Sequence, residues 1–439
     1  MYSPSEVEKF LARNTDSWDF IKDVDKKDLI EQIHELGGNS FKTVPFVHQL
    51  ASFLLGTHKE SFLYYLFCGA GKSKIVLDIL NYFFNNKKIS KTLILVPYTI
   101  TIESWVEQIK EHSNFTYLPL LGTTKQRWEL IKNCNDYDLV GLSYPGLTAM
   151  IPYSITKIKN KKRILLDYEK LDEFSNYFDS IIYDEIHEIK GFQTIIFSIC
   201  KYLSSKYKYK YGLTGTPTSR NLEDLWSQFY LIDGGETLGK TISFYRQAFF
   251  EQKKNYWGGY DYKINKDKKS LLMKIIKNIS ISYKDTEVFD LPEKINIKRY
   301  LLPTKQQTEF YKKAIEGIIE AKGDITLLDN SFVKLRQITS GFIKFISNEG
   351  EEVKIIFDEN PKLNALLEIL NEIGDEKLVV FNDYTITGDI ICDKLKQEKI
   401  GYERLYGDTE DKYETMQRFL KEKDCRVYVV NSKSGAMSL

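Results

Sequence analysis

Long apolar segments are missing from this sequence. Nowhere in its 439 residues do about twenty apolar residues follow one another, so we expect no membrane-spanning helix. Charged residues near the N-terminus leave no room for the apolar core of a signal peptide. We therefore expect a soluble protein of the cytoplasm. Abundant Lys, Ile, Asn and Tyr beside only 10 prolines favour an AT-rich genome, so a nucleoid, viral or phage context is also open.

The sequence also lacks any pairing of its cysteines. There are 5 of them, an odd number, and they stand far apart without a repeated spacing. A disulfide framework or a zinc site would need closely spaced or paired cysteines, so we expect neither. We predict reduced thiols at all of these positions, which are Cys68, Cys134, Cys200, Cys392 and Cys425.

An excess of charge of either sign is missing as well. The 62 Lys and Arg residues nearly equal the 61 Asp and Glu residues, and the formal net charge is +1. The whole chain therefore has no general attraction for a polyanion, which argues against a passive nucleic-acid coat. An enzyme with one basic channel stays compatible with this balance, because such a channel depends on where individual lysines lie.

A regular alternation of strand and helix patterns begins near Ser61. Short apolar runs alternate with amphipathic stretches of helical period, which predicts an α/β fold with a mostly parallel sheet. Ligands of such sheets bind outside the carboxyl ends of the strands. The expected strands are Ser61–Phe67, Thr92–Val96, Phe115–Leu120, Asp138–Ser143, Ser180–Asp184 and Lys208–Leu213, and the expected helices include Ser73–Phe84 and Thr101–His112.

The alternation stops after about Asp233 and later resumes. Residues 236–291 are rich in lysine and aromatic residues and predict a mainly helical insertion with a polar loop. That loop is either a solvated segment or a docking site for a protein partner. The elements expected further on are a strand at Lys294–Leu302, helices at Thr304–Lys322 and Ile325–Thr339, strands at Leu378–Phe381, Tyr402–Leu405 and Arg426–Val430, and helices at Gly388–Gln397 and Thr409–Leu420.

A glycine-rich loop lies between the first predicted strand and its helix. It reads Gly69-Ala70-Gly71-Lys72-Ser73. Glycines let backbone N–H groups surround an anion, Lys72 can reach the β- and γ-phosphates, and the Ser73 hydroxyl can bind Mg²⁺. The full phosphate-loop pattern would place another glycine where this chain has Leu66, so a plain glycine turn is the alternative.

Two adjacent carboxylates, Asp184 and Glu185, end the apolar strand Ser180–Asp184. Phosphoryl transfer needs one acidic group to hold Mg²⁺ and another to orient and deprotonate the attacking water. We expect the alternation of a strand to point these two side chains in different directions. His187 is a candidate sensor of the γ-phosphate or a plain surface histidine, and Lys190 is functional or simply solvated. Together, loop and acid pair predict nucleotide hydrolysis with Lys72, Asp184, Glu185 and His187 as catalytic candidates.

With both motifs in place, the chain resembles the superfamily-two helicases, and among them the Swi/Snf-like DNA translocases, from about Pro45 to Leu439. The most specific match is Leu213-Thr214-Gly215-Thr216-Pro217, which is similar to the Swi/Snf form of motif III. Asp184 to His187 is a DEAH-like box. The other matching segments are Pro45–Gln49, Leu95–Thr99 with Trp105, Leu142–Tyr144, Asn221 with Leu225–Ser227, Leu291–Lys294, Leu302–Thr304 with Gln307 and Tyr311, Leu335–Gln337, Val379–Asn382, Leu405–Thr409 and Val429–Ala436.

The resemblance implies two RecA-like parallel-sheet lobes that use ATP and Mg²⁺. The expected regions are an N-terminal helical segment 1–40, the ATP-binding lobe 41–235, the insertion 236–291, a lead-in 292–345 and a second lobe 346–439. The resemblance further implies that Gln49 reads adenine, that Gly435 belongs to the nucleotide site, and that Ser73 and Asp184 bind Mg²⁺. Candidates for contacts with nucleic-acid phosphates are Thr99, Ser143, Tyr144, Thr214 and Thr216.

The printed chain stops within motif V, so the second lobe is expected to be incomplete. Motif VI, with the arginines that contact the γ-phosphate in this family, is not in the sequence. We therefore expect nucleotide binding to survive and turnover by this chain alone to be strongly reduced.

The resemblance favours an ATPase and translocase stimulated by double-stranded DNA. Two alternatives remain open at this point: a DNA or RNA helicase that separates strands, and an ATP-binding clamp or scaffold with little hydrolysis.

Overall fold

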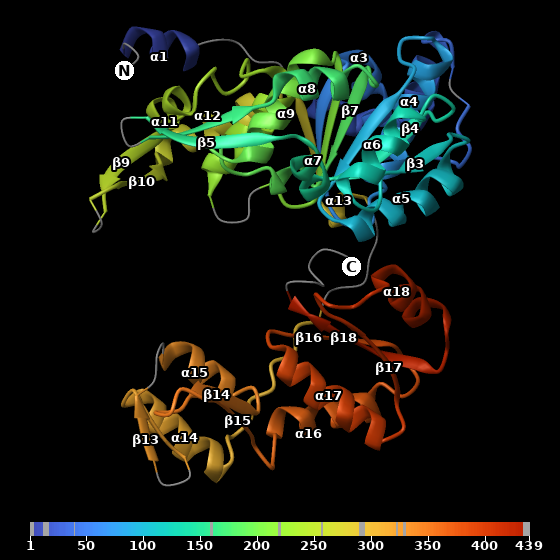
Figure 1. The fold of residues 1–439 in the computed structure, drawn as a ribbon. Coiled ribbons are helices and arrows are strands. Elements are labelled where there is room, and N and C mark those ends of the chain that lie inside the picture. The colour runs from blue at the N-terminus through green and yellow to red at the C-terminus, as the bar shows by residue number, and fades with distance from the viewer. Residues whose placement is uncertain are drawn as a thin grey trace. The chain divides into compact units, whose positions relative to one another are not determined.

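The computed structural model describes residues 4–11, 17–38, 40–158, 161–217, 221–255, 258–288, 295–321, 324–327 and 331–432. The chain divides into two compact units, Met1–Pro292 and Glu293–Leu439, called unit 1 and unit 2 below. Figure 1 follows the chain from blue at the N-terminus to red at the C-terminus. None of the helices in the described part combines the length and the apolar character that a bilayer crossing requires.

A seven-stranded, fully parallel sheet forms the centre of unit 1 (Figure 1). Its strands are almost continuously apolar because both faces of a parallel sheet are covered by helices. The order across the sheet is β11-β1-β8-β7-β2-β4-β3. The bounds are β1 Ser61–Leu66, β2 Thr92–Val96, β3 Tyr117–Pro119, β4 Leu139–Ser143, β7 Ser180–Asp184, β8 Tyr209–Thr214 and β11 Ser280–Tyr283.

Two layers of helices cover the two faces of this sheet, and each has its own apolar core. Helices α2 to α5 pack on one face, where Phe62, Ile94 and Ile182 point into the core. Helices α6 to α12 pack on the other face, with Leu63 and Leu95. The helices of unit 1 are α1 Pro4–Leu11, α2 Lys26–Glu35, α3 Val47–Lys59, α4 Lys72–Asn85, α5 Thr99–His112, α6 Thr124–Lys132, α7 Tyr144–Met150, α8 Tyr168–Ser175, α9 Ile195–Lys206, α10 Leu225–Asp233, α11 Ile242–Phe249, α12 Lys266–Ile276 and α13 Asp285–Val288, with 3₁₀ turns at Asp19–Asp23, Ile186–Glu188 and Leu222–Asp224.

The expected α/β class with parallel sheets is confirmed, but the prediction of a mainly helical insertion at 236–291 is partly wrong. This region forms a hairpin of β9 Phe250–Lys254 and β10 Tyr260–Ile264 between its helices. Its last strand, β11, pairs with β1 and becomes the edge of the main sheet. A four-residue strand has too little periodicity to stand out in a sequence, and its partner lies more than two hundred positions earlier. A second hairpin, β5 Tyr153–Ile158 with β6 Lys161–Leu166, was also not predicted.

Unit 2 contains a smaller parallel sheet with the order β16-β18-β17. Its strands and helices match the predicted second α/β segment to within a few residues. Two antiparallel hairpins and three helices precede this sheet along the chain. The bounds are α14 Lys305–Ile315, β12 Ile318–Ala321, β13 Asp324–Leu327, α15 Ser331–Ile338, β14 Phe342–Ile346, β15 Glu352–Ile356, α16 Pro361–Glu372, β16 Leu378–Asn382, α17 Thr385–Gln397, β17 Gly401–Leu405, α18 Lys412–Lys421 and β18 Cys425–Asn431.

Three predictions at the start of unit 2 are wrong. Residues 295–302 form no strand, and most of them are exposed, because no neighbouring strand pairs with them in the described structure. The helix expected from Thr304 to Lys322 ends at Ile315, since Gly317 has a φ of 76°, a left-handed conformation that commonly terminates helices. The first part of the helix expected at Ile325–Thr339 is instead the strand β13, and the helix begins only at Ser331.

Candidate nucleotide-binding site

Three adjacent strands of unit 1 bring the glycine loop and the acid pair to one edge of the sheet. β1 leads into the glycine loop, β7 ends at Asp184, and β8 lies between them and ends at Thr214. All three strands are parallel, so their carboxyl ends lie at the same edge. Neighbouring strands are about 4.8 Å apart, which places the ends of β1 and β7 about 10 Å from each other. The chain therefore gathers the two motifs where parallel sheets bind ligands.

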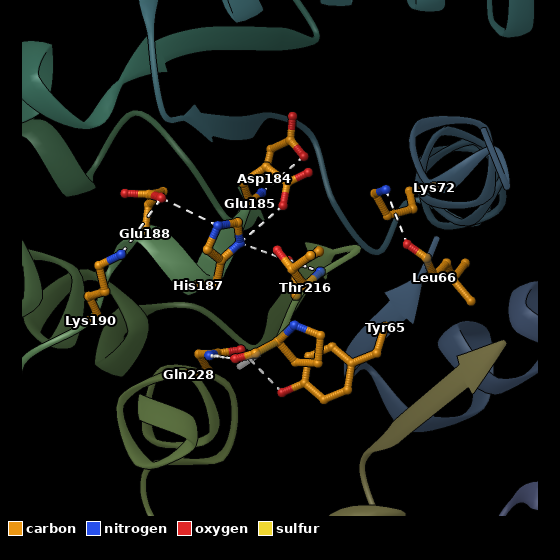
Figure 2. Close-up of polar contacts among 12 residues, drawn as sticks. Tyr65, Leu66, Lys72, Asp184, Glu185, His187, Glu188, Lys190, Thr216 and Gln228 are labelled. Carbon is orange, nitrogen blue, oxygen red and sulfur yellow. Dashed lines mark hydrogen bonds and ion pairs between the residues drawn. The ribbon is translucent and has the colours of Figure 1, made fainter. Parts of the chain in front are cut away.

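The glycine loop has the backbone conformation of an anion cradle. Gly69 has a φ of 85°, and Gly71 has a φ of 76° as the residue just before helix α4. Other residues adopt this left-handed region only at a cost. The α4 helix then begins at Lys72, so its first N–H groups and its positive dipole end face the loop. The ammonium of Lys72 donates to the carbonyl oxygens of Leu66 (3.2 Å) and Phe67 (3.4 Å), as Figure 2 shows for Leu66.

Two buried side chains at the start of helix α3 hold this loop from behind. Gln49 Nε2 donates to the carbonyl oxygen of Ala70 at 3.3 Å, and Gln49 Oε1 accepts from the backbone N–H of Phe46 at 3.0 Å. His48 Nε2 lies 2.8 Å from the same Ala70 oxygen. Burial lowers the pKa of His48, although the Ala70 carbonyl opposes this, so the imidazole is neutral and donates from Nε2. Sequence reasoning missed His48, and adenine recognition by Gln49 stays a prediction.

The acid pair diverges for a reason other than strand alternation. β7 ends at Asp184, and Glu185 has left-handed dihedrals, φ 45° and ψ 52°, directly before the 3₁₀ turn Ile186–Glu188. Such a conformation costs about 1 kcal/mol or more in a residue with a Cβ and is concentrated at functional sites. The expected alternation of strand side chains is therefore corrected: a turn of the backbone separates the two carboxylates. Asp184 Oδ1 accepts the backbone N–H of Glu185 at 3.0 Å.

The two carboxylates differ in their electrostatic environment. Burial, and then repulsion by Glu185, raise the pKa of Asp184 to about 6, against the opposing effects of Trp105 and Lys72. Burial would also raise the pKa of Glu185, but hydrogen bonds from His187 and the nearby Lys72 lower it below its ordinary value. A buried carboxylate whose charge is costly is well suited to a cation. Asp184 and the Ser73 hydroxyl supply the oxygen ligands that Mg²⁺ prefers, so the residues present fit this ion.

His187 connects the acid pair to the end of β8. Its Nδ1 lies 2.7 Å from Thr214 Oγ1 and 3.1 Å from Glu185 Oε2, and its Nε2 lies 3.3 Å from Glu188 Oε1 (Figure 2). Thr214 Oγ1 also accepts the backbone N–H of Thr216 at 3.0 Å. Burial lowers the pKa of His187, but its hydrogen bonds to the two glutamates outweigh burial and raise that pKa to about 9. His187 is therefore a cation at neutral pH.

Another hydrogen-bonded pair supports the segment that leaves β8. The Tyr65 hydroxyl donates to Gln228 Oε1 at 3.3 Å, and Gln228 Nε2 donates to the carbonyl oxygen of Pro217 at 2.7 Å (Figure 2). Gln228 is buried on helix α10. The strand β1, the helix α10 and the end of β8 are thus joined behind the candidate site.

The five candidates for nucleic-acid contacts fall into two groups. Thr99, at the start of α5, and Thr216 are exposed, and phosphate contacts there stay predictions. Ser143, Tyr144 and Thr214 are buried, and their hydroxyls bond within unit 1; Ser143 Oγ, for example, accepts the Gly146 N–H at the start of α7. Their burial argues against direct contact with a phosphate and for a positioning role. Two further predictions from the sequence lie outside the described residues; they concern Gly435 and the segment Leu291–Lys294.

Sequence reasoning did not identify two aromatic side chains as partners of Asp184. Trp105 Nε1 donates to Asp184 Oδ2 at 2.9 Å, and the Tyr144 hydroxyl donates to the Asp184 carbonyl oxygen at 2.7 Å. A buried Trp or Tyr needs a hydrogen-bond partner, so the sequence indicates that each of these side chains donates a hydrogen bond. The sequence does not indicate which residue accepts it.

Curated proteins similar to this chain include proteins of a phage, of bacteria and of yeast. "Putative protein p41" of Acyrthosiphon pisum secondary endosymbiont phage 1 is 24% identical over 357 residues, which cover 78% of this chain and 72% of that protein. An uncharacterized ATP-dependent helicase of Mycoplasma genitalium is 24% identical over 84% of this chain. The ISWI chromatin-remodeling complex ATPase of Saccharomyces cerevisiae is also 24% identical over 84% of this chain. The chain spans about a third of the length of these last two proteins, 33% and 32%.

Among solved structures, the Sulfolobus solfataricus SWI2/SNF2 ATPase core in complex with double-stranded DNA is similar with 21% identity and a TM-score of 0.45, covering 90% of this chain and 79% of that one. The SNF2-related domain family matches residues 57–354, which is more than half of the chain and includes the glycine loop, the acid pair and the end of β8. The chain therefore belongs to the SNF2-related family.

Proposed function

We propose that this chain binds and hydrolyses ATP and uses the energy to move along double-stranded DNA. One observation carries the proposal: the glycine loop and the acid pair lie at the carboxyl edge of one sheet, about 10 Å apart, with one strand between them. The family match and the names of the relatives support an ATPase in general.

The glycine loop would bind the phosphates of the nucleotide. The backbone N–H groups from Gly69 to Ser73 and the start of helix α4 supply partial positive charge, and Lys72 supplies a full one. In the present geometry the Lys72 ammonium is held by backbone carbonyls and by no carboxylate in the described structure, so it can turn toward a phosphate without breaking an ion pair.

Asp184 and Ser73 would hold magnesium, which when bound neutralises developing charge on the phosphoryl oxygens. Glu185 would orient the attacking water and accept its proton, since the carboxylate is kept ionised by His187 and Lys72. His187 would report the state of this site to the end of β8 through its bond to Thr214.

Movement along DNA requires contacts that do not read the base sequence. Phosphate contacts have this property and permit sliding. Thr99 and Thr216 are exposed, lie two to three residues beyond the ends of β2 and β8, and are suited to this role. The family resemblance and the remodelling ATPase among the relatives favour duplex DNA over single strands.

An ATPase assay with different nucleic acids tests the proposal. We expect this chain to hydrolyse ATP faster with duplex DNA than with single-stranded DNA or RNA. The Lys72→Ala variant serves as the inactive control. Stimulation mainly by single strands would instead indicate a strand-separating helicase. ATP-dependent DNA binding with negligible turnover under all of these conditions would indicate a clamp.

A further inference from the structure

Asp184 is held by two aromatic donors that come from opposite sides of the sheet. Trp105 lies on helix α5 in the core of one face, and Tyr144 begins helix α7 in the core of the other face. Both are buried, at 1% and 6% exposure, and their polar atoms lie 2.9 Å and 2.7 Å from Asp184. One helix layer therefore bonds to the carboxylate of Asp184, the candidate metal ligand, and the other layer bonds to its backbone carbonyl.

The bond from Trp105 differs from those of the other tryptophans that the structure describes. The indoles of Trp18, Trp128 and Trp226 all donate to backbone carbonyls, of Asn278, Met150 and Gly239. Trp105 instead donates to a carboxylate. Among the described residues, only this indole and the backbone N–H of Glu185 donate hydrogen bonds to the Asp184 carboxylate. With one donor on each oxygen, the Asp184 side chain has a defined orientation, and each oxygen keeps a lone pair for a cation.

Helix α5 begins at Thr99, an exposed candidate for contact with nucleic acid, whereas Ser143 and Tyr144 at the start of α7 are buried. β2 is the neighbour of β7, β4 is the neighbour of β2, and α5 and α7 follow them directly. Thr99 and Trp105 lie six residues apart on one helix, about 9 Å along its axis. A shift of the start of α5 would therefore move the indole with it. A hydrogen bond tolerates a change of only a few tenths of an ångström in its donor–acceptor distance before it weakens.

We propose that Trp105 and Tyr144 are positioning residues that orient Asp184 for magnesium, and that Trp105 transmits nucleic-acid binding at the start of α5 to the nucleotide site. This inference rests on the proposed function and adds its regulation. Binding of a duplex at the start of α5 would set the position of this helix, fix Asp184 and so tighten magnesium-dependent nucleotide binding. By linkage, nucleotide with magnesium would tighten duplex binding by the same factor.

Equilibrium binding of a fluorescent ATP analogue, titrated with Mg²⁺ and measured with and without a short DNA duplex, tests this inference without depending on turnover. The variants are Trp105→Phe and Tyr144→Phe. The second removes only a hydroxyl, so it remains informative if the first does not fold. Trp128→Phe and Tyr207→Phe are matched controls, since these side chains donate to the carbonyls of Met150 and Ser175 in the same unit.

We expect the Mg²⁺ concentration for half-maximal binding to rise at least about tenfold in both variants, which is the usual effect of removing a hydrogen-bond partner of a metal ligand. We also expect Trp105→Phe to lose the tightening caused by the duplex. Binding by both variants in EDTA, and binding by both controls, should match the unaltered chain. Variants of Trp105 and Tyr144 that behave like the controls would overturn the inference and leave the proposed ATPase intact. An unaltered chain that binds no nucleotide would overturn both.

Discussion

Gly71 and Gly69 offer a sharp test of how the glycine loop is held, because they share a left-handed backbone and differ in the space around them. A Cβ at Gly69 would meet nothing within 4 Å. A Cβ at Gly71 would lie 2.2 Å from Gln49 Nε2, closer than real Cβ contacts allow. Gly69→Ala therefore introduces backbone strain alone, and Gly71→Ala adds the displacement of the Gln49 amide.

The structure gives a magnitude for each change. A left-handed alanine costs about 1–2 kcal/mol at either position. In Gly71→Ala, Gln49 must also give up its bond to the Ala70 carbonyl, its bond from the Phe46 N–H, or both. Losing a buried hydrogen bond costs about 1–3 kcal/mol more. We expect Gly71→Ala to lower the free energy of unfolding of unit 1 by about 2–5 kcal/mol and Gly69→Ala by about 1–2 kcal/mol.

Urea denaturation followed by tryptophan fluorescence measures these values, because all 5 tryptophans lie within unit 1 and report on it alone. The double variant Gln49→Ala with Gly71→Ala supplies the decisive comparison. Once the Gln49 amide is gone, the added methyl group has room, so the two substitutions together should destabilise less than their sum. Equal effects of the two glycine substitutions, or strict additivity in the double variant, would refute this account of the loop.

Three further predictions concern the charged residues. For His187→Gln in EDTA, we expect a loss of stability of about 2 kcal/mol below pH ~6.5 that disappears above pH ~9. The reason is that the hydrogen bonds of His187 to Glu185 and Glu188 outweigh burial and raise the His187 pKa to about 9. A pH-independent difference in urea midpoints would contradict this. For Asp184→Asn, we expect unchanged or greater stability at neutral pH, since burial and Glu185 raise the Asp184 pKa to about 6. We also expect this variant to lose Mg²⁺-dependent nucleotide binding. If binding still depends on Mg²⁺, Asp184 is not a ligand of the metal. For Lys72→Ala, we expect at least a ~100-fold loss of ATP turnover, because the ammonium stabilises phosphoryl charge. The urea transition should stay intact, because among the described residues the ammonium bonds only to the backbone carbonyls of Leu66 and Phe67.

The predictions that succeeded depend on local patterns of residues. β2 and β7 have the predicted bounds, and the other strands of the main sheet from β1 to β8 deviate by up to two residues at an end, because continuous apolar runs between turns indicate buried strands. The failures share a different cause. The strand β11 is short and finds its partner β1 far away in the chain, and the segment 295–302 has a strand-like composition without a partner strand. Pairing between distant segments is not encoded in a local window.

The sequence by itself determined the α/β class, the glycine loop, the acid pair and their place at strand ends, because apolar periodicity and glycine act over a few residues. Only the tertiary structure decided which side chains meet around Asp184. Trp105 and Tyr144 are 79 and 40 positions away from it in the chain, and the order β7-β2-β4 brings them together. The same holds for His48 and Gln49 behind the loop. Hydrogen bonds need their atoms within about 3 Å, and a distance of that size between remote residues exists only after the sheet has formed.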